Sequence, residues 1–72
     1  MNNYSIETQG VVTKVLPNTI FRIQVDDGTE VLGNLSHKMK KNYTRILVGD
    51  RVKIALTSYQ ARQGCITQRF PE

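Results

Sequence analysis

The sequence is poor in the residues from which disulfide frameworks and metal centres are built. Its 72 residues include one cysteine and one histidine, so no internal disulfide can form and no metal-ligand spacing is present. No apolar run approaches the ~18 residues of a transmembrane helix. The first residues show neither the apolar region of a signal peptide nor an Arg- and Ser-rich transit character. We therefore expect no metal, no cofactor and no membrane partner, and a reducing compartment that resembles the cytosol.

Catalytic groupings are also scarce. The sequence offers no Ser/His/Asp or Cys/His arrangement, and it names no activator for the thiol of Cys65. His37 stands among cations, away from any acid, and the carboxylates of Asp26 and Asp27 fall in a predicted turn. A core of this size leaves little room for a substrate cleft. We therefore predict that the chain is not an enzyme and that its function lies on its surface.

Positive charge, by contrast, is concentrated in one segment. The chain has ten Lys and Arg against six Asp and Glu, which gives a net charge of +4. Residues 37–45, here called the basic insert, read HKMKKNYTR; they hold four basic residues and no acid, so they supply the whole net charge. A cationic segment on an otherwise neutral body is typical of proteins that bind polyanions. The alternative is a solvated charged face, although such faces usually mix both signs.

Alternating apolar residues predict five strands. The longest run is Ile6–Leu16, and shorter runs cover residues 21–25, 31–35, 52–56 and 65–70. Gly10 predicts a bulge or sharp bend where one strand serves two sides of a barrel, and Gly33 is a second candidate bend. Turn residues separate the runs at Pro17-Asn18, Asp26-Asp27-Gly28, Gly49-Asp50 and Gly64.

The interval between the third and fourth strands differs in kind. Ser36 is a candidate N-cap, and the residues after it are helix formers without Gly or Pro. We expect a turn or two of helix, or a mobile basic loop, before Leu47 and Val48 return the chain to the body. Five strands with an insert at this point predict one all-β domain over residues 1–72, a five-stranded Greek-key OB barrel. An SH3-like barrel has the same strand count and is the alternative.

The insert and the last strand hold the candidate nucleic-acid contacts. Tyr43 and Met39 offer a stacking face and a soft apolar contact among the lysines. If the segment is extended, Tyr43 and Arg45 point to one face, and a ring beside a guanidinium suits unpaired RNA bases. Arg69 adds a planar fork that suits phosphate.

Structural roles are the alternatives for these side chains. Tyr43 would cover the end of the barrel, and Arg45 would be a surface ion-pair partner. Arg69 would form a salt bridge with Glu7 or Glu30. Three further cations alternate with core residues and either extend the basic face or form the solvated side of the sheet, of which the second is favoured: Arg22, Arg51 and Lys53.

Four motifs stand in a fixed order along the chain. They are Glu7–Gly10 (ETQG), Leu16–Arg22 (LPNTIFR), Lys38–Leu47 (KMKKNYTRIL) and Gly49–Val52 (GDRV). Together they resemble the opening strand and the Leu-Pro-Asn-x-x-Phe-Arg, Lys-Met-Arg-Lys-x-Tyr-Ile-Arg-Ile-Leu and Gly-Asp-Lys-Val segments of bacterial-type translation initiation factor one. The likeness covers nearly the whole chain, residues 5–70.

The resemblance implies a single S1-like OB domain that binds the small ribosomal subunit at its aminoacyl (A) site. It implies contacts with the decoding region of the small-subunit RNA and with the neighbouring ribosomal protein. It also implies that the protein blocks premature tRNA entry, works with initiation factors two and three, and is a monomer. Bacterial cytoplasm is the implied location, with the plastid stroma as the alternative. The RNA-facing residues of the family map onto Lys38, Met39, Lys40, Lys41, Tyr43, Arg45 and Arg69.

The chain departs from the family pattern at several positions. His37 stands where the family usually has Gly, and Thr44 replaces an apolar residue. Cys65 and Gln63 occupy positions that are usually or often basic, and the chain ends in the acid Glu72. Because these changes thin the basic surface of the last strand, we expect binding to depend more on residues 38–45.

Two other functions remain open from the sequence. One is a single-stranded RNA chaperone of cold-shock type, which is also a five-stranded OB module but has aromatic-rich strands. This chain has two Phe and no Trp, and its tyrosines at positions 4, 43 and 59 fall outside the strand centres, which argues against that function. The other is a protein-interaction barrel that uses its edge on an acidic partner.

Overall fold

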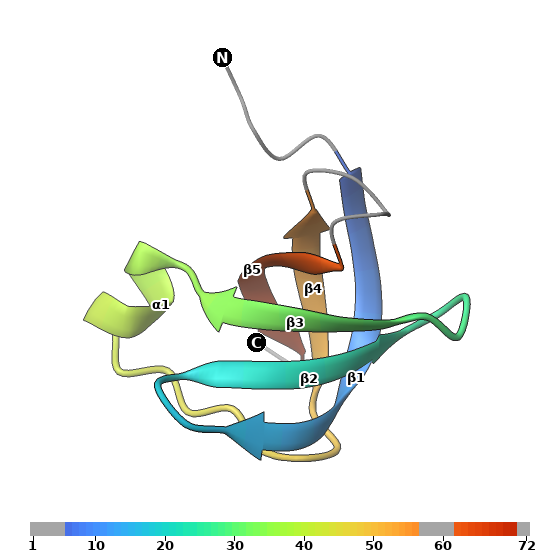
Figure 1. Cartoon of the computed structure of the whole chain (residues 1–72). Coiled ribbons are helices and arrows are strands. Elements are labelled where there is room, and N and C mark those ends of the chain that lie inside the picture. The colour runs from blue at the N-terminus through green and yellow to red at the C-terminus, as the bar shows by residue number, and fades with distance from the viewer. Residues whose placement is uncertain (1–5, 57–61, 71–72) are drawn as a thin grey trace.

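The strands close into a barrel. The computed structural model describes residues 6–56 and 62–70. Along the chain lie β1 (Ile6–Leu16), β2 (Ile20–Val25), β3 (Glu30–Leu35), α1 (His37–Lys41), β4 (Arg51–Leu56) and β5 (Gln63–Phe70) (Figure 1). The barrel order is β1-β2-β3-β5-β4, and every pair is antiparallel except β3 with β5. The predicted five-stranded OB barrel with a helical insert between the third and fourth strands is confirmed.

The long first strand serves two sides of the barrel, as predicted from Gly10. Gly10 pairs with one residue of β2 and one residue of β4 at the same time. A Cβ at this position would lie 2.5 Å from the carbonyl oxygen of Gln24, so only glycine allows the two strands to approach. The register irregularity against β2 falls later, between Val12 and Lys14. The predicted bulge is therefore present, but it lies at Thr13.

The core is built from the inward side of each strand. The side chains with at most 1% of their surface exposed come from β1, β2, β4 and β5: Val12, Ile23, Val52, Ile54, Leu56 and Ile66. Met39 of α1 and Ile46 of the following loop join the same cluster. The helical insert therefore closes part of the core instead of standing apart from the barrel.

The turn between β2 and β3 follows the predicted Asp-Asp-Gly signal. Gly28 adopts a φ of +93°, which side chains other than glycine rarely allow. The N–H of Thr29 donates to Asp27 Oδ1 at 2.9 Å, and this bond lowers the pKa of the Asp27 carboxyl. Asp26 forms an ion pair with Arg51 at 3.1 Å. The two carboxylates shape and brace the turn, which agrees with the sequence interpretation.

Three details of the sequence prediction need correction. Gly64 lies inside β5 instead of before it. Gly33 is a close-packing position in a regular strand and not a bend, since a Cβ there would lie 3.0 Å from the side chains of Ile23 and Ile54. Leu47 and Val48 are 56% and 62% exposed, so it is their neighbour Ile46 that anchors the loop to the core. The expectations for Tyr4, Tyr59 and Glu72 lie outside the described residues.

Candidate nucleic-acid interface

The basic insert begins with a capped helix. Ser36 has extended backbone angles, and its Oγ accepts a hydrogen bond from the N–H of Met39 at 3.2 Å. This is the N-cap that the sequence predicts, and it satisfies one of the donors that a helix start leaves free. The N–H of Ser36 itself donates to the carbonyl of Ile66 at 3.0 Å. The helix is therefore tied at its start to β5.

The helix turns its lysines outward and its methionine inward. Lys38, Lys40 and Lys41 are exposed, whereas Met39 is only 7% exposed and belongs to the core. Met39 is the one apolar residue of α1, so it fills the face that packs on the barrel. The expectation that Met39 contacts RNA is therefore not supported, because its side chain is covered in this conformation. The isolated apolar residue among lysines was the signal for burial.

Replacing Met39 with alanine is expected to destabilise the fold by about 2–5 kcal/mol, because it empties part of the core. Chemical denaturation measures this destabilisation, and Lys38→Ala is the matched control on the exposed face, with an expected change within about 0.5 kcal/mol. The folded fraction of Met39→Ala should still bind RNA. Unchanged stability with abolished binding would return Met39 to the interface.

The helix ends in a Schellman motif with a tyrosine where glycine is usual. The N–H of Tyr43 donates to the carbonyl of Lys40 at 3.1 Å, and the N–H of Thr44 donates to the carbonyl of Met39 at 3.0 Å. The backbone of Tyr43 adopts the left-handed conformation, with a φ of +54°, and its side chain is 92% exposed. The alternative in which Tyr43 covers the barrel end is wrong. The ring is held in solvent at the end of a lysine-rich helix.

Arg45 lies close to Tyr43 in the sequence, but the segment that contains them is not an extended strand. Since Tyr43 is left-handed, the same-face argument for Tyr43 and Arg45 does not hold as stated. Both side chains are nevertheless exposed, with Thr44 half-buried between them. No ion pair joins Arg45 to any residue in the described ranges. The ion-pair alternative for Arg45 is therefore not supported.

Arg69 lies on the core-facing side of β5 near the end of that strand. A register shift against β4 places Arg69 opposite Val52, whose side chain is fully buried. Arg69 is half-buried, and among the described residues it has no ion pair with Glu7 or Glu30. Arg51, by contrast, is paired with Asp26 across the barrel surface. The salt-bridge alternative for Arg69 is therefore not supported, its contact with RNA stays a prediction, and Arg51 is occupied by Asp26.

Cys65 lies close to the insert but is not an activated thiol. Burial raises the pKa of Cys65, and the charge of Lys40 opposes that rise without overcoming it. The hydrogen bond from the N–H of Ser36 to the carbonyl of Ile66 places the start of α1 beside the middle of β5. No group of three or more His, Cys, Asp or Glu that could hold a metal ion occurs in residues 6–56 and 62–70. What the site offers is positive charge, an exposed ring and a guanidinium.

Comparison with known proteins agrees with this geometry. The family model for translation initiation factor 1A / IF-1 matches residues 2–72. The chain belongs to this family. The initiation factor barrel is similar to the solution structure of translation initiation factor one from the Wolbachia endosymbiont strain TRS of Brugia malayi. The TM-score is 0.74 and the identity 34%, over 90% of this chain and 77% of that one.

A second solved structure shares only the fold with this initiation factor. It is YjeQ from Thermotoga maritima, with a TM-score of 0.73 and 24% identity over 90% of this chain and 23% of that one.

In the described part of the initiation factor, no helix has the length and apolar character needed to cross a membrane. The family resemblance read from the sequence is confirmed.

Proposed function

We propose that the protein binds the small ribosomal subunit at the A site, where it contacts the decoding region of the RNA and the adjacent ribosomal protein. Occupancy of this site blocks premature tRNA entry, and initiation factors two and three act with it. The protein acts as a cytoplasmic monomer without catalytic activity. The observation that carries the proposal is the basic insert, which exposes its lysines, Tyr43 and Arg45 to solvent in a chain that belongs to the initiation factor family.

The proposed mechanism is capture through shape and charge. Lys38, Lys40 and Lys41 replace counterions on RNA phosphates, which makes the affinity depend on salt. Tyr43 and Arg45 pack on bases that are unpaired at the decoding site, since RNA recognition relies on stacking with aromatic rings and guanidinium planes. Arg69 adds a phosphate contact from β5. Because residues His37–Lys41 are already helical, less ordering of this segment is required on binding.

The structure weakens the cold-shock alternative. Such modules stack bases on aromatic side chains of the outer sheet face. Phe21, the one aromatic residue of β2, is only 5% exposed and belongs to the core. The fully exposed aromatic ring in the described ranges is Tyr43, on the insert and not on a strand. The insert, not a sheet of aromatics, is the surface to test first.

Sedimentation of the purified chain with small ribosomal subunits tests the proposal. We expect one chain per subunit, weaker binding as salt rises, and displacement by a ligand of the A site. Equal binding to any single-stranded RNA would leave only a general RNA-binding barrel. Retention on an acidic protein without binding to the subunit would favour the protein-interaction alternative.

A further inference from the structure

A turn between the basic insert and β4 fastens the insert to the barrel. Residues 47–50 form this turn, in which the N–H of Asp50 donates to the carbonyl of Leu47 at 3.0 Å. Gly49 has a φ of +95°, the left-handed angle that the third position of a type II turn requires. The N–H of Gly49 donates to the carbonyl of Val12 at 2.8 Å, and the N–H of Val12 donates to the carbonyl of Asp50 at 2.9 Å. The insert is therefore held at both ends, by the hydrogen bond of its N-cap residue to β5 and by this turn on β1.

The side chain of Asp50 locks the turn. Its Oδ2 accepts a hydrogen bond from the N–H of Leu47 at 2.9 Å, so Leu47 is bonded to Asp50 through both its N–H and its carbonyl. Asp50 is the one acid in residues 42–50, and it makes no ion pair with any described residue. A negative charge at this place opposes the approach of a polyanion. A favourable contribution of Asp50 to RNA binding must therefore come from the backbone conformation that it imposes.

Arg45 lies between the locked turn and the end of α1. The segment that contains it forms neither helix nor strand, so no regular ladder of hydrogen bonds holds it. On one side the N–H of Thr44 is bonded back to α1, and on the other the N–H of Leu47 is bonded to Asp50. Ile46 is buried in the core, which fixes the depth of the segment but not the orientation of the peptide that follows. The bond between Leu47 and Asp50 fixes that orientation.

We propose that Asp50 is a positioning residue for RNA binding, which holds the segment at Arg45 in the conformation that meets the RNA. The inference rests on the proposed function, because that function supplies the ligand of Arg45. It adds a residue that does not touch the ligand and whose charge disfavours it. Asp50 acts through its hydrogen bond with Leu47, so its carboxylate matters as an acceptor and not as a charge.

Two substitutions of Asp50 separate the acceptor from the charge. Asp50→Asn and Asp50→Ala remove the same negative charge, but only the amide oxygen of the first can accept the N–H of Leu47. Binding to small ribosomal subunits is measured by sedimentation at a temperature at which both variants are folded. We expect Asp50→Asn to bind within about twofold of the wild type and Asp50→Ala to bind about tenfold more weakly. Electrostatics alone predicts that both bind equally, and more tightly than the wild type.

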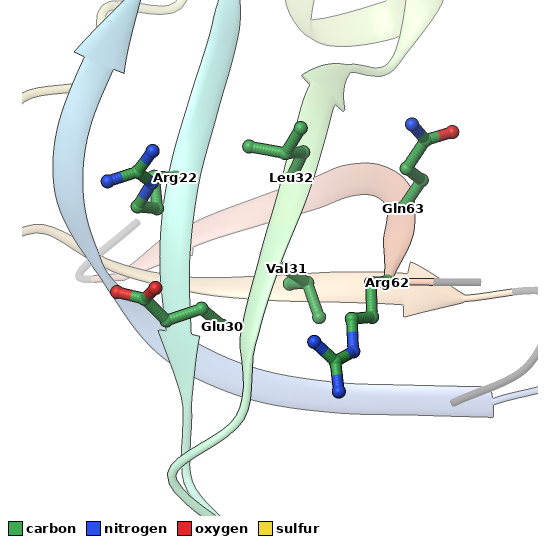
Figure 2. Close-up of a pocket in the computed structure, with 6 residues that line it drawn as sticks. All are labelled: Arg22, Glu30, Val31, Leu32, Arg62 and Gln63. Atoms are coloured by element: carbon green, nitrogen blue, oxygen red, sulfur yellow. The ribbon is translucent and has the colours of Figure 1, made fainter. Parts of the chain in front are cut away.

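Two other acids provide matched controls. Asp27 makes the same kind of bond, with the N–H of Thr29 at 2.9 Å, in the turn between β2 and β3 on the side of the barrel away from α1 (Figure 1). Glu30 lines a hollow of about 410 Å³ together with Arg22 (Figure 2), and its carboxylate has no ion pair among the described residues. Asp27→Ala removes a turn lock of the same chemistry, and Glu30→Gln removes a charge alone. Neither is expected to weaken binding by more than about twofold, because neither removes a phosphate contact.

A double-mutant cycle tests whether Asp50 acts through Arg45. In the Arg45→Gln background, Asp50→Ala should change the affinity by less than about twofold, because the contact that Asp50 positions is already absent. A general loss of stability would instead weaken binding by the same factor in both backgrounds. Hydrogen exchange of the Leu47 amide reports on the lock directly. It should be faster in Asp50→Ala than in the wild type and nearly unchanged in Asp50→Asn.

Three outcomes would overturn the inference. They are binding of Asp50→Ala as tight as that of Asp50→Asn, an equal loss in either control, and a loss in the Arg45→Gln background as large as in the wild type. The wild type in the same experiment reports on the proposed function. If it fails to sediment with subunits, that function falls and the positioning role falls with it. Equal sedimentation of the wild type and Asp50→Ala removes the positioning role alone.

Discussion

Replacing Lys40 and Lys41 together with glutamine is expected to weaken binding to the small ribosomal subunit and to flatten its salt dependence. The slope of log affinity against log salt should decrease by about 0.7–0.9 for each phosphate that is no longer neutralised, so by about 1.4–1.8 for the pair. Both side chains are exposed at the end of α1, and neither has an ion pair within the described residues. Their charges are therefore free to displace counterions from RNA. Sedimentation at a series of salt concentrations measures the slope.

The stability of this variant should remain close to that of the wild type. The lysines of the last helical turn gain a small benefit from the helix dipole, about 0.3–1 kcal/mol at most. Thermal unfolding separates that effect from binding. The variant K14Q/K53Q removes two charges elsewhere and should leave the slope nearly unchanged. An unchanged slope in K40Q/K41Q would remove the insert from the interface.

The barrel was predictable because local patterns and global topology agree. Alternation in β2 and β4 matches the buried positions, and the Asp-Asp-Gly signal forms its turn. The pairing register of the strands was not predictable, because it depends on contacts between strands that are far apart in the sequence. The pairing of β1 with β2 skips Thr13, and the pairing of β4 with β5 skips Thr67 between Gln68 and Ile66. The second of these decides which way Arg69 faces.

Composition located the candidate site, but it could not predict which way each side chain of the site points. The excess of lysine over acid located the insert, and three of the four turn signals fall between strands, whereas Gly64 lies inside β5. Which side chain faces the core depends on how a five-residue helix sits on the barrel, and this buries Met39. Ile46 is buried for the same reason, although Leu47 and Val48 are equally apolar in sequence.

Tyr43→Gly is expected to stabilise the protein and to weaken its binding to RNA at the same time. Glycine adopts the left-handed conformation of the Schellman position without the cost of about 1 kcal/mol or more that a side chain incurs there. The exposed ring makes little packing contact that its removal would forfeit. If the ring stacks on a base, its removal lowers the binding free energy by about 1–3 kcal/mol. Denaturation and subunit sedimentation measure the two changes independently.

Two further substitutions separate the ring from the backbone. Tyr43→Phe keeps the ring and the strained conformation, so it should bind nearly as the wild type does if stacking dominates over the hydroxyl. Tyr43→Asn removes the ring but tolerates a positive φ, so it should resemble glycine in binding. Opposite signs for stability and affinity identify a residue that is kept for binding at a structural cost. A loss of stability in Tyr43→Gly would show instead that the ring packs on the barrel, and normal binding would exclude it from the RNA contact.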